Sequence, residues 1–170
     1  MTTFFHRLRK PVAMVGLGIR STENQIDDDV PLTKTKTIQL TALQIRTLKT
    51  TAVEVIPAPG ATRAISILHM HAWLAYNSAA YDGVGAGENL VLKYTNASGA
   101  TITNAITGTG FADATSTQHR CVLGLQTEIT PVANAAVVAN VLSGEWYAAA
   151  GNSPINLQIT YIDLPVTFTV

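Results

Sequence analysis

The chain has 170 residues, of which 47% are hydrophobic and 13% are charged, and its formal net charge is zero. This length suffices for one domain with its own core, and the balanced charge gives the chain as a whole no attraction for nucleic acid or anionic lipid. The single cysteine, Cys121, excludes an internal disulfide, and no apolar run approaches the length of a membrane span.

The shortage of charge points to a covered surface. Globular domains carry about 25% charged residues, roughly twice the share found here. A small monomer with so few charges would be poorly protected against self-association. The composition therefore predicts that partner proteins cover much of the surface. Cys121, which has no metal-binding or redox motif around it, is expected to be a buried, inert thiol.

The first 36 residues differ from the rest in charge and pattern. They hold ten of the 22 acidic and basic residues and show no sustained helical or alternating period. Such a stretch cannot build a core, so we expect an extended arm that becomes ordered on a partner. The residues expected to contact that partner are Phe4, Phe5, Arg7, Arg9, Lys10, Asp27, Asp28 and Asp29.

From residue 37 onwards the pattern is that of one folded domain. Leu40, Leu43 and Leu48 recur at helical spacing, and Thr41 is placed to cap a short helix. The side chains of residues 51–56 alternate as in a strand, and the following Pro-Ala-Pro-Gly turn ends this strand. Residues 63–76 form the longest apolar run, rich in β-branched and aromatic residues, and predict one long or bent strand.

The second half of the domain predicts short strands joined by turns. Strands are expected at residues 89–95, 101–106, 122–129 and 155–162, and loops at 77–87, 96–99 and 148–154. The pattern leaves 111–117 open between a helical turn and a loop, and 136–142 open between a strand and an Ala/Val segment of another type. The alternation is cleanest from Ile155 to Tyr161. Strands at this spacing favour an all-β class, mainly a jelly-roll-like β-sandwich, here with one short helix and the N-terminal arm. The predicted domains are the arm at 1–36 and the sandwich at 37–170.

Two histidines deserve a test as metal ligands. On a strand, His69 and His71 point to the same face, where two imidazoles can bind one ion. A metal site needs a further ligand, and both His6 and His119 are far along the chain. We therefore predict that the pair holds no metal and that both histidines are partly buried and hydrogen-bonded.

The remaining motifs do not predict catalysis. The glycines at 16–18 and 83–87 complete no phosphate-binding motif, and Asp27, Asp28 and Asp29 lack the spacing of a calcium loop. The Asn96-Ala97-Ser98 sequon matters only in a secreted protein, and no serine or histidine lies in a recognisable nucleophile setting. We predict a protein that is not an enzyme and uses no cofactor.

The order of several segments resembles that of small structural proteins of tailed bacteriophages. The resemblance runs over about residues 38–163, through the helix, the Pro57-Ala58-Pro59-Gly60 block, and the segments 73–76, 89–94 and 151–161. It implies a capsid decoration protein (a cement or auxiliary head protein) of the small jelly-roll type, often trimeric, with no catalytic residues.

The resemblance also implies partners and a location. The expected partners are the major capsid protein and further copies of the chain, with no nucleic acid and no membrane. The protein would be made in the host cytoplasm and lie on the capsid exterior, binding across joints between capsid proteins. The main alternative is a trimeric head- or tail-fibre domain that binds a host receptor or glycan through Tyr81-Asp82 or Glu145-Trp146-Tyr147; an enzyme accessory domain is a weaker one.

Overall fold

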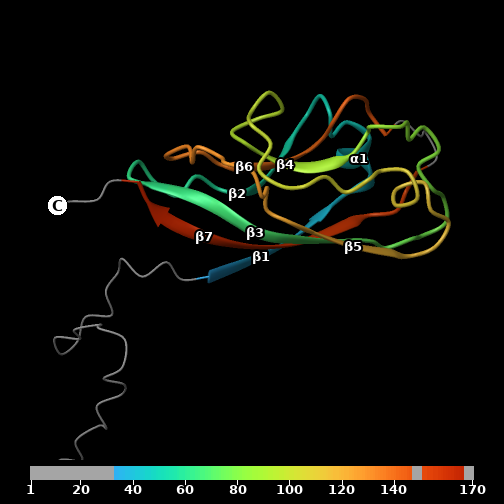
Figure 1. The fold of residues 1–170 in the computed structure, drawn as a ribbon. Coiled ribbons are helices and arrows are strands. Elements are labelled where there is room, and N and C mark those ends of the chain that lie inside the picture. Colours follow the sequence, from blue (N-terminus) through green and yellow to red (C-terminus); the bar gives the residue numbers. More distant parts are fainter. Residues whose placement is uncertain (1–32, 147–150, 167–170) are drawn as a thin grey trace, which may run out of the picture. The chain divides into compact units, whose positions relative to one another are not determined.

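A computed structural model describes residues 33–146 and 151–166, which form a sandwich of two antiparallel sheets. The elements are β1 (Thr33–Leu40), α1 (Ala42–Arg46), β2 (Val53–Ile56), β3 (Arg63–Leu74), β4 (Leu90–Tyr94), β5 (Gln118–Leu123), β6 (Val137–Val141) and β7 (Ile155–Pro165). One sheet has the strand order β1-β7-β3-β5 and the other β2-β6-β4. The two sheets lie as layers one above the other (Figure 1).

Every connection between successive strands crosses from one sheet to the other. This alternation is the jelly-roll arrangement, which confirms the predicted fold class. The segment from Thr101 to Ile106, predicted as a strand, runs beside β4 through isolated bridges at Leu90↔Ile106 and Lys93↔Thr101. It therefore extends the three-stranded sheet without forming a continuous strand of its own.

Local sequence explains the first turn of the domain. Thr41 caps α1 as predicted: its hydroxyl accepts from the Gln44 amide, and the Gln44 side chain accepts from the Thr41 amide, which completes a capping box. The helix is short, as predicted, and spans five residues. Strand β2 then ends at Ile56, immediately before Pro57, which cannot donate to a ladder.

The predicted long strand is confirmed and is bent. In β3 the pairing with β7 shifts between Ile67 and His69, so Leu68 is the extra residue of a bulge. Its 38% exposure follows from that position. On β7 the predicted alternation is confirmed, because Ile155, Leu157 and Ile159 are fully buried and the residues between them are not.

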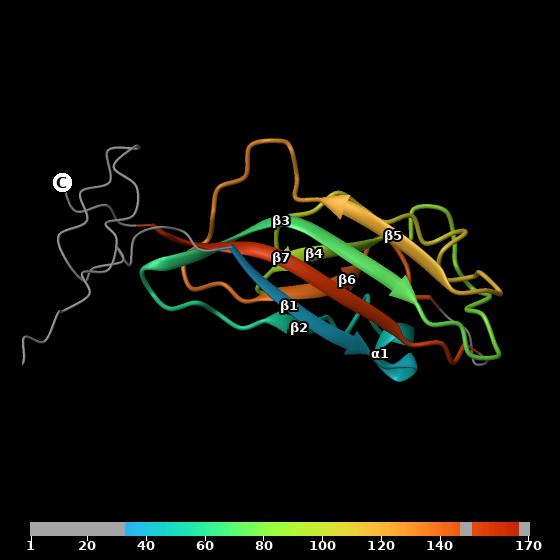
Figure 2. The same ribbon diagram turned by 90° about the horizontal axis from the view of Figure 1, so that it is seen from below.

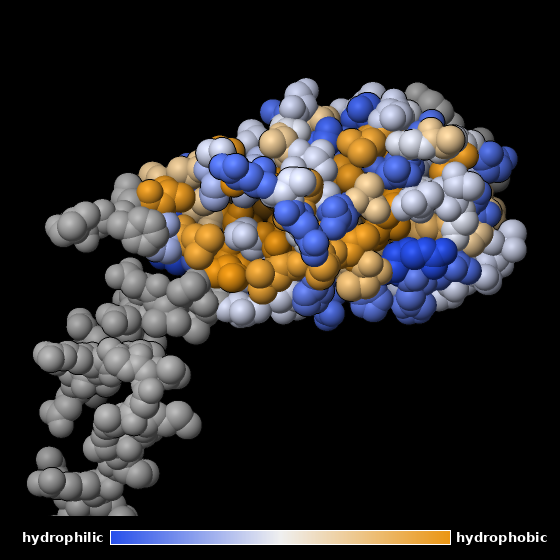
Figure 3. Space-filling model, in the orientation of Figure 1, coloured by the Kyte–Doolittle hydropathy of each residue, from blue (hydrophilic) through white to orange (hydrophobic). Residues whose placement is uncertain are grey.

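The core lies between the two sheets. Its largest fully buried side chains are Trp146, Tyr81, Phe111 and a set of aliphatic residues from both layers. Figure 3 shows hydrophobic residues gathered along the level between the sheets. Tyr94 of β4 links the two sheets across the core, because its hydroxyl donates to the carbonyl oxygen of Ile65 in β3.

Several predicted boundaries need correction. Residues Thr33–Lys36 belong to β1 and pair with β7, so the part of the predicted arm from 33 to 36 is wrong. The expected strand at 122–129 lies earlier, at Gln118–Leu123, because β5 forms where it meets β3 and not where its own residues are most apolar. The rest of the predicted arm lies outside the described residues, so the two-domain division stays a prediction.

Candidate interaction surface

Strands β1, β7, β3 and β5 lie side by side in the four-stranded sheet (Figure 2), and the side of this sheet that faces away from the core is a candidate interaction surface. Strand register sets its membership, since residues opposite one another on paired strands share a face. Its rows are Thr35–Thr160–His69–Leu123, Thr37–Gln158–His71–Cys121 and Gln39–Asn156–Trp73–His119. We call these twelve residues the outer face. They include no aspartate, glutamate, lysine or arginine.

Side chains on the outer face contact one another across the strands. The Gln39 amide donates to the Asn156 side-chain oxygen at 3.0 Å, and the Thr160 hydroxyl lies 3.1 Å from Nε2 of His69. The ring of His71 lies 5.7 Å from that of Trp73, centre to centre. Lateral contacts of this kind hold the side chains in place, so the face is preformed.

The β5 side of the outer face corrects two expectations. His119 is far from His71 in sequence, yet their rings lie 5.8 Å apart because β5 pairs with β3. Cys121, expected to be buried, is exposed opposite His71. Within residues 33–146 and 151–166, these side chains do not form a group of three or more ligands that could hold a metal ion. The metal prediction for His69 and His71 remains a prediction.

A small hollow of about 250 Å³ lies next to the Pro57-Ala58-Pro59 turn. At its rim Asp163 bonds to Lys34 at 3.1 Å and to Arg63 at 2.7 Å. Burial of the carboxyl opposes its ionisation, but the hydrogen bonds and charges of Arg63 and Lys34 outweigh it and lower the pKa of Asp163. This ion network joins β1, β3 and β7, and it fixes the start of β1 to the sandwich.

The aromatic residues proposed for receptor or glycan binding are largely inside the protein. Tyr81 and Trp146 are fully buried, and Glu145 is 4% exposed. The Tyr81 hydroxyl donates to the Ser153 carbonyl oxygen, and the Trp146 indole donates to that of Glu88. Tyr147 lies outside the described residues. The buried rings of Tyr81 and Trp146 therefore hold loops together and present no stacking platform to a sugar.

The structure does not test the arm contacts. Phe4, Phe5, Arg7, Arg9, Lys10, Asp27, Asp28 and Asp29 all lie outside the described residues. The outer face was missed because half of its first strand had been assigned to the arm. The Thr-Lys-Thr-Lys-Thr alternation at 33–37 was the available signal. Of the helices in the described part, none is long and apolar enough to cross a membrane.

Comparison with known proteins gives one similar solved structure. No family model and no curated protein matches the sequence. A chain of the cyanophage Pam1 capsid asymmetric unit aligns with 91% of this chain and 99% of its own length, at 16% identity and a TM-score of 0.43. A likeness of this size does not establish a shared function.

Proposed function

We propose that this chain is a structural protein of a bacteriophage virion, one that decorates the capsid by binding across joints between major capsid proteins. The observation that carries the proposal of a structural, assembled protein is the uncharged outer face, which suits being covered by another protein. The jelly-roll order of the strands and the resemblance of residues 38–163 to small phage structural proteins support it.

An uncharged sheet face suits contact with protein. Surfaces exposed to water use charge for solubility, whereas the centres of interfaces are poor in charged residues and rich in aromatic ones. The polar members of the outer face are threonine, asparagine, glutamine and histidine, which both donate and accept hydrogen bonds. A second copy of the chain can therefore meet the face without burying an unpaired charge, and we assign it to the contact between copies in a homotrimer.

Charge placed on the outer face tests that assignment. The side chain of Gln158 lies in the middle row, so Gln158→Lys would bury an unpaired ammonium if the face is covered. The variant should sediment as a monomer where the unaltered protein sediments as a trimer. Thr127→Lys, at an exposed loop position, is the matched control and should stay trimeric. A trimeric Gln158→Lys protein, or an unaltered protein that is monomeric at micromolar concentration, would remove this assignment.

The predicted arm is the proposed contact with the capsid. Its cationic start and anionic middle would reach complementary patches on two capsid subunits, and its apolar side chains would supply most of the affinity. Because Thr33–Lys36 pair with β7, the informative truncation begins at Thr33. It should keep the thermal transition of the sandwich but sediment poorly with undecorated capsids.

Two other results are informative for the arm. A lower melting temperature together with a dissociated oligomer would mean that the arm is exchanged between protomers. Full binding of the truncated protein to capsids would refute the docking arm while leaving the outer-face assignment standing. A truncation beginning at Thr37 serves as the positive control for damage to the fold, because it also removes half of β1.

A further inference from the structure

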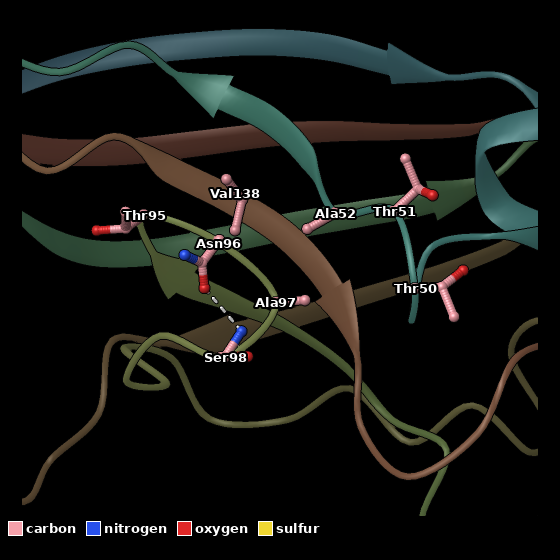
Figure 4. Close-up of a pocket in the computed structure, with 8 residues that line it drawn as sticks. All are labelled: Thr50, Thr51, Ala52, Thr95, Asn96, Ala97, Ser98 and Val138. Atoms are coloured by element: carbon pink, nitrogen blue, oxygen red, sulfur yellow. Dashed lines mark hydrogen bonds between the residues drawn. The ribbon is translucent and has the colours of Figure 1, made fainter.

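A groove of about 440 Å³ lies on the outward side of the three-stranded sheet. Val138 of β6 forms its floor, residues 50–52 before β2 form one wall, and the turn 95–98 after β4 forms the other (Figure 4). Val138 faces outward because its neighbours Val137 and Ala139 belong to the core. The groove is thus on the opposite sheet from the outer face.

Both walls of the groove are held by hydrogen bonds to the sandwich. On one side, the Thr95 amide donates to the Ala136 carbonyl oxygen at 2.8 Å, and the Asn96 side chain accepts from the Ser98 amide (Figure 4). Thr95 has a φ of 65°, which is strained for a β-branched residue. On the other side, the buried Glu145 carboxylate accepts from the Thr50 amide and hydroxyl. The groove is therefore preformed.

A buried ammonium group lies behind the turn. Lys93 pairs with Val138 in the sheet, is only 7% exposed, and donates from Nζ to the Ala97 carbonyl oxygen at 2.6 Å. Neither ion pair within the described residues involves Lys93. Burial, and then the positive charge of Lys49, lower the pKa of Lys93. A buried charge without a carboxylate partner is costly unless another group supplies the negative charge.

We propose that this groove binds a carboxylate-bearing, extended segment of a partner protein. Thr95 and Ser98 line the groove and carry hydroxyls that can donate hydrogen bonds, whereas the Thr50 hydroxyl already donates to Glu145. Lys93, which donates to the Ala97 carbonyl oxygen, supplies positive charge at the turn 95–98, whereas the buried Glu145 carboxylate lies behind Thr50 in the opposite wall. Ala52, Ala97 and Val138 give the groove an apolar surface for the chain of the ligand, and none of its lining residues in the described part of the chain is aromatic.

The negative charge of Glu54 determines at which side of the groove the carboxylate of the ligand lies. Glu54 pairs with Val138 from the β2 side and is exposed, so it disfavours a carboxylate at that side of the floor. The acidic group is therefore seated toward the turn 95–98, above Lys93. This site lies on the opposite sheet from the outer face, and it does not depend on the proposed role in a virion.

The test is a titration of the full chain, labelled with nitrogen-15, with the tripeptide acetyl-Asp-Asp-Asp-amide. The amide signals of Thr50, Ala97 and Ser98 should shift in a saturable way, with an affinity at least tenfold above that of acetyl-Asn-Asn-Asn-amide. Lys93→Met, which keeps most of the aliphatic stem, should weaken binding at least tenfold. Lys36→Met, at an exposed lysine of the other sheet, is the matched control and should change nothing.

A second variant covers the case in which Lys93→Met does not fold. Ala52→Leu narrows the groove without removing the ammonium group and should also abolish the shifts. Equal binding of the acidic and neutral peptides, unchanged binding by Ala52→Leu, or no saturation with the acidic peptide would overturn the proposal. Inorganic phosphate that binds as tightly as the acidic peptide would also overturn it, since the site would then select a simple anion.

Discussion

Replacing Glu145 tests how the connection between α1 and β2 is held. Its carboxylate is 4% exposed and accepts from the Lys49 amide at 2.7 Å, from the Thr50 amide at 2.7 Å and from the Thr50 hydroxyl at 2.6 Å. Glu145→Ala leaves two backbone donors without this partner. A buried donor left unpaired costs about 1–3 kcal/mol, so we expect a loss of about 3–5 kcal/mol in the free energy of unfolding.

Glu145→Gln keeps the shape of the side chain but removes its negative charge, so it measures the effect of the charge apart from that of the packing. The amide keeps one acceptor oxygen for a backbone donor but turns an NH₂ group toward the other, so the expected loss is about 2 kcal/mol. The assay is urea unfolding at one fixed protein concentration, because oligomerisation shifts apparent stability. Glu54→Gln, at an exposed position of β2, is the control and should stay within about 0.5 kcal/mol. A loss below about 1 kcal/mol for Glu145→Ala would refute the reasoning.

Three further predictions concern protonation, a buried hydroxyl and metal. The pKa of Asp163 is lowered in the fold, so its stabilising contribution is present above the ordinary carboxyl pKa of 3.8 and is lost as pH falls below it; Asp163→Asn should flatten acid unfolding curves in that range. Burial raises the pKa of Tyr81 from 10.0 to about 12, so the wild-type stability should fall as pH rises from 10 towards 12, and Tyr81→Phe should cost about 1 kcal/mol or more because the Ser153 carbonyl oxygen loses its donor. Elemental analysis of untagged protein should find substoichiometric zinc, copper and nickel; a stoichiometric metal lost in His71→Ala would contradict this.

The strands that could be predicted from the sequence are those whose hydrophobic pattern shows which side of the strand packs on the core. In β7, Ile155, Leu157 and Ile159 alternate with polar residues because one face of the strand packs on the core. A different signal predicts β3 and β4, whose runs are continuously apolar enough to stand out. For these elements the hydrophobic pattern and the turn residues agree, which is the condition under which reading a sequence succeeds.

The first strand could not be read in this way. From Thr33 to Thr37, β1 is exposed on both sides and lies at the edge of its sheet, so no apolar residue marks its inner face. The Thr-Lys alternation is compatible with a strand, but its partner residues on β7 are more than 100 positions away, and that pairing decides which face of Thr33–Lys36 turns outward. The outer face, the proximity of His71 to His119 and the exposure of Cys121 depend on long-range register in the same way.

The placement of charge strengthens the argument for a covered surface. Many of the domain's few charged groups bond to the protein itself instead of extending freely into water. The side chains that do so are Lys34, Arg46, Arg63, Glu88, Lys93, Arg120, Glu145 and Asp163. The charge that remains free to keep the domain soluble is therefore lower than its composition indicates, while one whole sheet face has none. Such a domain gains from being covered, because association removes an uncharged surface from water and leaves few ion pairs to rearrange.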